Sequence, residues 1–209
     1  MIFLGSRGRP ASLQRVFDSN PTHPGIVMLD EDDAHNYAKV RIPPNWTIEV
    51  EQRTPLVPRI NKVVARFPDL EWYGFGCDDI ICSPGWDVEL AKEAGRYNVA
   101  WGDDLINGVK LSAVPFVGGD LVRAAGWFYP PVFKHLYGDY VWYLVSQALG
   151  NGVYRPDVIT EHLHWSTGKQ PYDQTARERP VAHDHAVWPK FEKNELPVII
   201  DRLKRLRPC

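Results

Sequence analysis

The fold is indicated most clearly by the stretch Trp72-Tyr-Gly-Phe-Gly-Cys-Asp-Asp-Ile-Ile-Cys-Ser-Pro-Gly-Trp-Asp87. Its apolar first half predicts a buried strand, which ends abruptly at two adjacent carboxylates, Asp78 and Asp79. A Pro-Gly turn and a new helix are expected to follow. Two acids at the end of a strand suit Mg²⁺ or Mn²⁺, because such an ion takes one or two protein oxygens and completes its shell with phosphate and water. The same acids would also suit a solvated loop or a helix cap, so the choice depends on the rest of the chain.

Strands and helices alternate through the first half of the chain. Short apolar runs predict strands at residues 2–4, 25–29 and 48–50, and apolar residues at helical spacing predict helices from Pro10 and over residues 56–67. This alternation predicts an α/β fold with a mostly parallel central sheet and helices on both faces. In such sheets ligands bind beyond the carboxyl ends of the strands.

Charged side chains follow three of these predicted strands. Arg7 and Arg9 come after the strand at residues 2–4, Asp30 follows the strand at residues 25–29, and Asp78 and Asp79 end the strand that begins at Trp72. The three loops converge on one edge of the sheet if the topology is as predicted. That convergence favours a metal–diphosphate site over a solvated turn.

The second half of the chain is less regular. Further strands are predicted at residues 97–101, 115–117 and 157–160, and helices at residues 119–125 and 139–149. Residues 166–187 are polar and highly charged, which favours a mobile flap, and residues 195–207 are predicted to form an amphipathic C-terminal helix. With no internal repeat or clear boundary, residues 1–209 are expected to form a single domain.

The composition is that of an ordinary soluble globular protein, with 44% hydrophobic and 24% charged residues. A net charge of −2 gives no general attraction to nucleic acid or membranes. Three cysteines form no closed disulfide set, and neither a signal peptide nor a membrane span is visible. A cytoplasmic protein is therefore expected.

Two loops carry candidate ligands. Ser6-Arg-Gly-Arg9 opens a helix, where backbone donors can meet an anion and an arginine can stack or form forked hydrogen bonds. His162 and His164 point to the same side if their stretch is extended, so either could complete a metal site beside Asp79. His164 is preferred because it is nearer the polar segment, although such histidines are often simple edge residues.

Two further residues suit chemistry on a phosphate or a hydroxyl. Lys169 is in a flexible Ser-Thr-Gly-Lys stretch and could bring its charge onto a phosphate, although a solvated lysine fits equally well. Asp139 is expected to cap the helix over residues 139–149. The helix dipole would hold its carboxylate ionised, as a general base requires.

Taken together, these motifs resemble the small GT-A-type glycosyltransferases, which transfer sugars from nucleotide-diphosphosugars. The likeness covers about residues 1–175 and is closest to compact, single-domain members of the kind found in phage and bacterial genomes. The motifs that carry it are Phe3-Leu-Gly-Ser-Arg-Gly-Arg-Pro10, Gly76-Cys-Asp-Asp-Ile80 with Pro84-Gly-Trp-Asp87, Tyr137-Gly-Asp-Tyr-Val-Trp142 and Glu161-His-Leu-His-Trp-Ser-Thr-Gly-Lys169.

The resemblance implies a role for each candidate residue. Asp79 and His164 would bind Mn²⁺ or Mg²⁺, with Asp78 supporting the metal or binding the donor, and Asp139 would be the catalytic base. The residues implied to contact the donor nucleotide or its phosphates are Arg7, Gly8, Arg9, Asp30, Asp32, Asn61, Lys62 and Lys169. A phage-encoded enzyme would act in the host cytoplasm. The sequence departs from the family's pattern at one position, which weakens the case for a metal-dependent reaction. The family's usual acid-any-acid signature is here Cys77-Asp78-Asp79, so Cys77 replaces its first acid.

The expected reaction is sugar transfer to a hydroxyl by single displacement with inversion, the acceptor being a glycan or a hydroxymethylated DNA base. The latter would have to be unstacked from its duplex. Two alternatives stay open. One is a metal-dependent phosphoryl or nucleotidyl transferase, and the other is a sugar-nucleotide-binding module that has lost catalysis, which Cys77 would favour.

Overall fold

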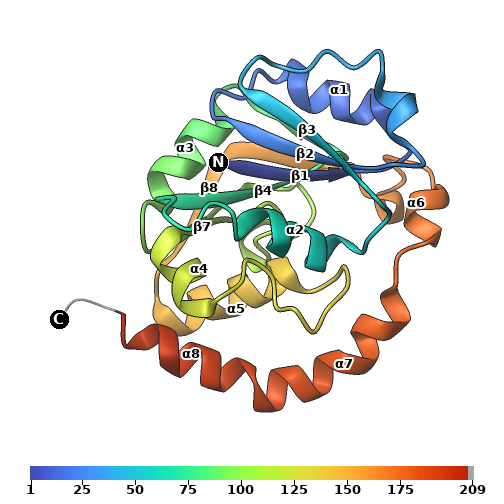
Figure 1. The fold of residues 1–209 in the computed structure, drawn as a ribbon. Helices are drawn as coiled ribbons and strands as arrows, with labels where there is room; N and C mark the ends of the chain where they lie inside the picture. Colours follow the sequence, from blue (N-terminus) through green and yellow to red (C-terminus); the bar gives the residue numbers. More distant parts are fainter. Residues whose placement is uncertain (207–209) are drawn as a thin grey trace.

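An eight-stranded sheet runs through the computed structural model, which describes residues 1–206 (Figure 1). In spatial order its strands are β3 (Trp46–Glu51), β2 (Gly25–Asp30), β1 (Ile2–Ser6), β4 (Trp72–Cys77), β7 (Phe116–Gly118), β6 (Val99–Asp103), β8 (Gly152–His162) and β5 (Ile80–Cys82). Strands β1 to β4 are mutually parallel, and β6 is parallel to β8. Only β7 and β5 run against their neighbours. The mostly parallel α/β sheet predicted from the sequence is confirmed.

Helices cover both faces of this sheet, as predicted. They are α1 (Pro10–Asp18), α2 (Leu56–Val64), α3 (Trp86–Ala94), α4 (Gly119–Ala125), α5 (Gly138–Leu149), α6 (Gln174–Arg177), α7 (Val181–Asn194) and α8 (Leu196–Lys204). Figure 1 shows α1 on one side of the sheet and α2, α4 and α5 on the other, with α7 and α8 packed outside them.

The alternation of side chains along β1 divides the interior into two cores. Phe3 contributes to the core beneath α2, α4, α5, α7 and α8, whereas Ile2 and Leu4 contribute to the core beneath α1 and α3. All three side chains are fully buried. Successive strand residues point to opposite faces, so a strand buried on both sides must be apolar throughout.

The structure differs from the sequence prediction around Asp79, where a short strand replaces the expected direct turn into a helix. Strand β5 pairs antiparallel with β8, bringing Ile80 opposite His162. Its three residues show no periodicity of their own, and its partner is about 80 residues later in the chain. This pairing holds the end of β8 beside the acids that follow β4.

Local geometry also corrects the start of α5. Its N-cap is Tyr137, at φ 71°, and Asp139 is the second residue of the helix. Tyr137 takes this left-handed conformation where Gly138 packs so closely on Tyr129 that a Cβ atom would lie 2.2 Å from the ring. The cap position predicted for Asp139 is therefore wrong by two residues.

The polar segment 166–187 contains more helix than its composition suggests. It includes α6 and the first turns of α7, which begins at Val181. Its mobility stays a prediction. Of the predicted C-terminal helix, α8 accounts for Leu196–Lys204, and Arg207 lies outside the described residues. Within residues 1–206, no helix combines the length and hydrophobicity needed to cross a bilayer.

Candidate functional site

A cavity of about 740 Å³ opens beyond the carboxyl ends of β1, β2 and β4. Its walls include the residues that follow these strands, the start of α5 and the end of β8. Among the residues singled out in the sequence, the cavity is lined by Arg7, Arg9, Asp30, Asp78, Asp79, Asp139, His162 and His164. The convergence of three strand ends predicted from the sequence is therefore confirmed.

The two acids after β4 have different surroundings. Asp78 is 5% exposed and accepts a hydrogen bond from Ser6 Oγ at 2.7 Å. Burial, together with the negative charge of Asp79, raises the pKa of the Asp78 carboxyl. Asp79 faces the cavity, where His162 and Arg9 help to lower its pKa against the opposing effect of burial. Asp79 is thus the acid held ionised at the cavity surface.

Arg9 links both acids to the polar segment 166–187. Its Nη1 atom lies 3.1 Å from Asp78 Oδ1 and 2.9 Å from Asp79 Oδ2. On its other side, Nε and Nη2 donate to the carboxylate of Asp173 at 2.7 and 3.0 Å. One guanidinium therefore contacts three carboxylates, an arrangement that its planar fork of donors permits.

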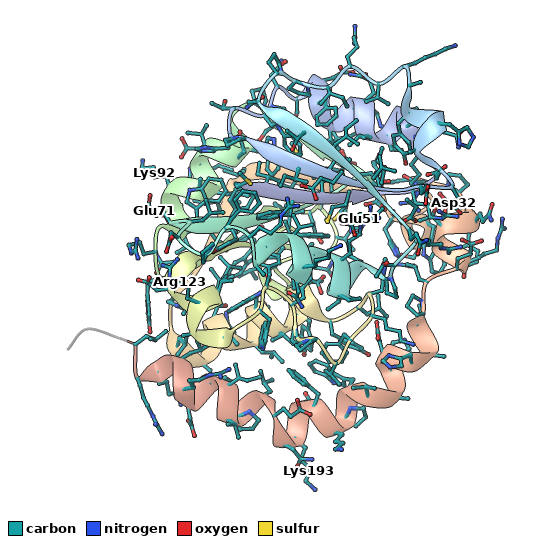
Figure 2. All side chains as sticks on the ribbon, viewed as in Figure 1. Asp32, Glu51, Glu71, Lys92, Arg123 and Lys193 are labelled. Carbon is teal, nitrogen blue, oxygen red and sulfur yellow. The ribbon has the colours of Figure 1, made fainter. Side chains whose placement is uncertain are left out.

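Arg7 is paired with the acids at the end of β2. Its Nη1 lies 2.9 Å from Asp30 Oδ2 and 2.7 Å from Asp32 Oδ1. The buried Arg59 donates to the other oxygen of Asp30 at 2.7 Å, which fixes that carboxylate. Figure 2 shows Asp32 at the edge of the sheet where β2 ends, beside the segment that contains α6. Asp32 and Gly8 lie at the rim and do not line the cavity.

The two histidines after β8 are not equivalent. His162 Nε2 lies 3.4 Å from Asp79 Oδ1. Burial lowers the pKa of His162, but the interaction with Asp79 outweighs it and the pKa is raised. His164 instead contacts Ser166 Oγ through Nδ1, at 2.6 Å. The structure therefore places His162, and not the preferred His164, against Asp79.

Asp139 lies in the cavity wall with its carboxylate in the first turn of α5. Its Oδ1 accepts the backbone N–H of Tyr140 at 2.8 Å. Burial raises the pKa of Asp139, and the backbone hydrogen bonds offset only part of this effect. The shift is opposite to the one expected from the helix dipole, because desolvation dominates.

Three residues predicted to contact the donor lie away from the cavity. Asn61 fixes the loop after α4 by accepting from the backbone of Phe128 and Tyr129 and donating to Tyr129 O. Lys62 is 67% exposed and paired with Glu51. Lys169 is paired with Glu161 at 2.6 Å. None of the three lines the cavity.

The structure also adds cavity residues that sequence reasoning missed, namely Arg59, His135 and Arg179. Burial lowers the pKa of His135 to about 4, so its imidazole is neutral near pH 7. Its loop is fixed by Asp184 of α7, which accepts the backbone N–H groups of Lys134, His135 and Leu136. No local pattern points to these residues, because they reach the cavity only through long-range packing.

The cavity offers a small set of side chains, Asp79 and His162, that suits a divalent cation. Among residues 1–206, no group of three or more His, Cys, Asp or Glu side chains is placed to hold a metal. Asp79 Oδ1 and His162 Nε2 are nonetheless 3.4 Å apart, close to the ~3 Å expected for adjacent ligands at ~2.1 Å from an octahedral ion. Mg²⁺ and Mn²⁺ sites often have this form, with phosphate and water completing the shell.

Solved structures resemble this chain in fold. The mannosyltransferase PcManGT from Pyrobaculum calidifontis, in complex with GDP-Man and Mn²⁺, superposes with a TM-score of 0.59 at 11% identity, covering 98% of this chain and 72% of that one. Residues 1–349 of S. aureus TarS superpose with a TM-score of 0.54 at 12% identity, covering 77% of this chain and 59% of that one. Rv0371C from Mycobacterium tuberculosis H37Rv, in complex with manganese, superposes with a TM-score of 0.50 at 13% identity, covering 80% of this chain and 94% of that one.

Neither a protein-family model nor a curated protein matches the sequence. The likeness to known proteins is therefore structural, and at these identities it concerns the fold alone. The likeness to PcManGT covers 98% of this chain, so it includes the sheet and the helices on both of its faces. This chain has the fold of the GT-A-type glycosyltransferases, as its motifs predicted.

Proposed function

We propose that this protein is a glycosyltransferase that moves a sugar from a nucleotide-diphosphosugar to a hydroxyl acceptor. The observation that carries the proposal is the meeting of Asp79, His162 and Asp139 in one cavity of a GT-A-type fold. The first two suit a cation–diphosphate complex, and the third suits proton removal. A neighbour of the same fold binds GDP-Man and Mn²⁺, which supports a nucleotide-sugar donor.

The donor would lie along the ends of β1, β2 and β4. Arg7, with its charge balanced by Asp30 and Asp32, would border the nucleoside, where the acids can accept from ribose hydroxyls. Asp79 and His162 would hold Mn²⁺ or Mg²⁺. When bound, the ion would supply positive charge to the diphosphate oxygens.

Asp139 would act as the general base. The acceptor oxygen attacks the anomeric carbon, the bond from that carbon to the diphosphate oxygen breaks, and the acceptor proton passes to Asp139. A single displacement of this kind inverts the anomeric configuration. Burial raises the pKa of Asp139 toward the working range, which strengthens it as a base as long as it stays ionised.

The acceptor would lie against apolar side chains of the cavity lining. These include Ile106, Leu111 and Trp165, of which Trp165 is 41% exposed. An exposed indole can stack on the flat face of a sugar ring or of a base. Both proposed acceptors, a glycan and a hydroxymethylated DNA base, therefore fit this wall, and the net charge of −2 favours the glycan.

A thermal-shift panel of nucleotide-sugars, with and without Mn²⁺, tests the proposal, because a ligand that binds the folded state raises its unfolding temperature. We expect one nucleotide-sugar to stabilise the protein, and more strongly with the ion. That donor is then incubated with glycans or with hydroxymethylated duplex DNA, and the product's anomeric configuration is determined. Nucleotide binding without transfer or hydrolysis would favour the binding module, and diphosphate cleavage without sugar transfer would favour the other transferase class.

A further inference from the structure

The cationic side chains around the cavity are almost all neutralised by the protein itself. Four of its five arginines have a carboxylate partner within hydrogen-bonding distance. The pairs are Arg7–Asp30 at 2.9 Å, Arg9–Asp79 at 2.9 Å, Arg53–Glu178 at 2.6 Å and Arg59–Asp30 at 2.7 Å. These arginines have little positive charge left for a ligand.

Arg179 is the exception among the cavity-lining arginines of residues 1–206. It is half-buried at the cavity wall, next to Pro180, the N-cap of α7. Its side chain donates from Nε to Ala176 O at 3.3 Å and forms no ion pair with a carboxylate of the described residues 1–206. Its charge is felt at His135, which also lines the cavity: burial lowers the pKa of His135 most, and the charge of Arg179 lowers it further.

An anionic donor needs such a cation. Five carboxylates line the same cavity: Asp30, Asp78, Asp79, Asp139 and Glu178. A diphosphate entering this space adds negative charge to a site whose own charges are already balanced. An unpaired guanidinium is the group best suited to receive it, because its planar donors match phosphate oxygens in pairs.

We infer that Arg179 binds the diphosphate of the donor and stabilises the charge that develops on it as the sugar leaves. This assignment rests on the proposed function and replaces Lys169, which is bound to Glu161 outside the cavity. Donors aimed at a position where charge develops accelerate a reaction most when they are held in place beforehand.

The segment that carries Arg179 is tied across the site. Both carboxylate oxygens of Asp173 accept hydrogen bonds from the guanidinium of Arg9, and Thr175 Oγ1 donates to the backbone oxygen of Arg7 at 2.8 Å. Glu178 accepts from Arg53, which also lines the cavity. These ties come from the residues that border the proposed donor, so the segment positions Arg179 over it.

Calorimetric titration with inorganic diphosphate, and with matched nucleoside mono- and diphosphates, tests the assignment. Arg179→Gln is compared with Arg177→Gln, which removes the same charge from the same segment. Arg177 is exposed, and its guanidinium donates to the backbone oxygen of Tyr172. We expect Arg179→Gln to weaken diphosphate binding roughly 10- to 100-fold, the range of a hydrogen bond to a charged group, with little change for the monophosphate. Arg177→Gln should behave as wild type.

The outcomes separate the two proposals. Equal loss of mono- and diphosphate affinity in Arg179→Gln, or unchanged diphosphate binding, would overturn the assignment of Arg179 alone. Failure of the wild-type protein to bind any nucleoside diphosphate would overturn the proposed function itself. If Arg179→Gln folds poorly, Arg179→Lys is used, which keeps the positive charge but lacks the paired N–H donors of the guanidinium. Its affinity for diphosphates, and only for these, should lie between those of the wild type and Arg179→Gln. Wild-type affinity would contradict a paired contact between the guanidinium and the phosphate oxygens.

Discussion

The guanidinium of Arg9 and the carboxylate of Asp173 form a forked pair, with hydrogen bonds of 2.7 and 3.0 Å, between residues 164 positions apart in the chain. Both side chains are mostly buried, with 12% and 26% of their surface exposed. The same Arg9 contacts Asp78 and Asp79. The pair therefore connects the acids after β4 to the segment over the cavity.

Asp173→Asn should release this segment without unfolding the protein. The substitution removes the charge of a partly buried pair and weakens the cap of α6, where Asp173 Oδ1 accepts the N–H of Ala176. We expect faster amide hydrogen exchange over residues 173–178 and a loss of about 1 kcal/mol in the free energy of unfolding. Asp201→Asn, at an exposed position on α8, is the control. Unchanged exchange over residues 173–178 would contradict the role of the pair.

Asp139→Asn should abolish transfer and leave donor binding intact. An amide cannot accept the acceptor's proton, and loss of a general base typically costs about 10²- to 10⁴-fold in rate. Initial rates and donor affinity are measured on the same preparation, so that binding serves as the internal control. Wild-type turnover in this variant would exclude Asp139 as the base.

The pH dependence of the wild-type rate gives a separate test of Asp139. The base works when ionised, so the rate should fall as the pH is lowered through its pKa. Because burial raises that pKa, the fall should occur at a higher pH than the ~3.9 of an ordinary aspartate. The profile of kcat is recorded at saturating donor and acceptor. A rate that is constant down to about pH 4 would contradict the raised pKa.

Local patterns were enough to predict the strands that build the site. The strands that end at Ser6, Asp30 and Asp78 can each be recognised from a few consecutive apolar residues. The carboxyl ends of neighbouring parallel strands lie at the same edge of the sheet, so their common site also follows. Strand β5 and the position of Arg179 depend on partners far along the chain. The choice between His162 and His164 likewise depended on β5, whose pairing with β8 places His162 opposite Ile80 and beside Asp79.

His162→Ala and His164→Ala should separate the two candidate ligands. His162 is adjacent to Asp79, so its loss should weaken Mn²⁺ binding in the presence of donor at least tenfold, whereas His164→Ala should have a small effect. Metal ligation needs a neutral imidazole, and the pKa of His162 is raised, so Mn²⁺ affinity should increase with pH through that pKa. Calorimetric titration with Mn²⁺ at several pH values measures both effects. The opposite ranking of the variants would restore His164 as the ligand.

Asp184→Asn should destabilise the loop that presents His135 to the cavity. The Asp184 side chain is fully buried and accepts three backbone N–H groups at 2.7 to 2.8 Å. An amide nitrogen would face one of these donors, so we expect a loss of about 1–3 kcal/mol in the free energy of unfolding. Burial opposes the charge of Asp184, but the hydrogen bonds prevail and its pKa is lowered. Its stabilisation is therefore complete above the unfolded pKa of ~3.9 and is lost as the pH falls through the folded value.

Urea unfolding of wild type, Asp184→Asn and the surface control Asp201→Asn, measured from pH 7 to pH 3, checks this assignment. The difference between wild type and Asp184→Asn should be largest at pH 7 and shrink at the acid end, because protonation weakens the same hydrogen bonds that the substitution removes. A constant difference across this range would show that the contribution of Asp184 does not depend on its ionisation. Equal stability of the two proteins at pH 7 would show that the three N–H groups do not need this carboxylate.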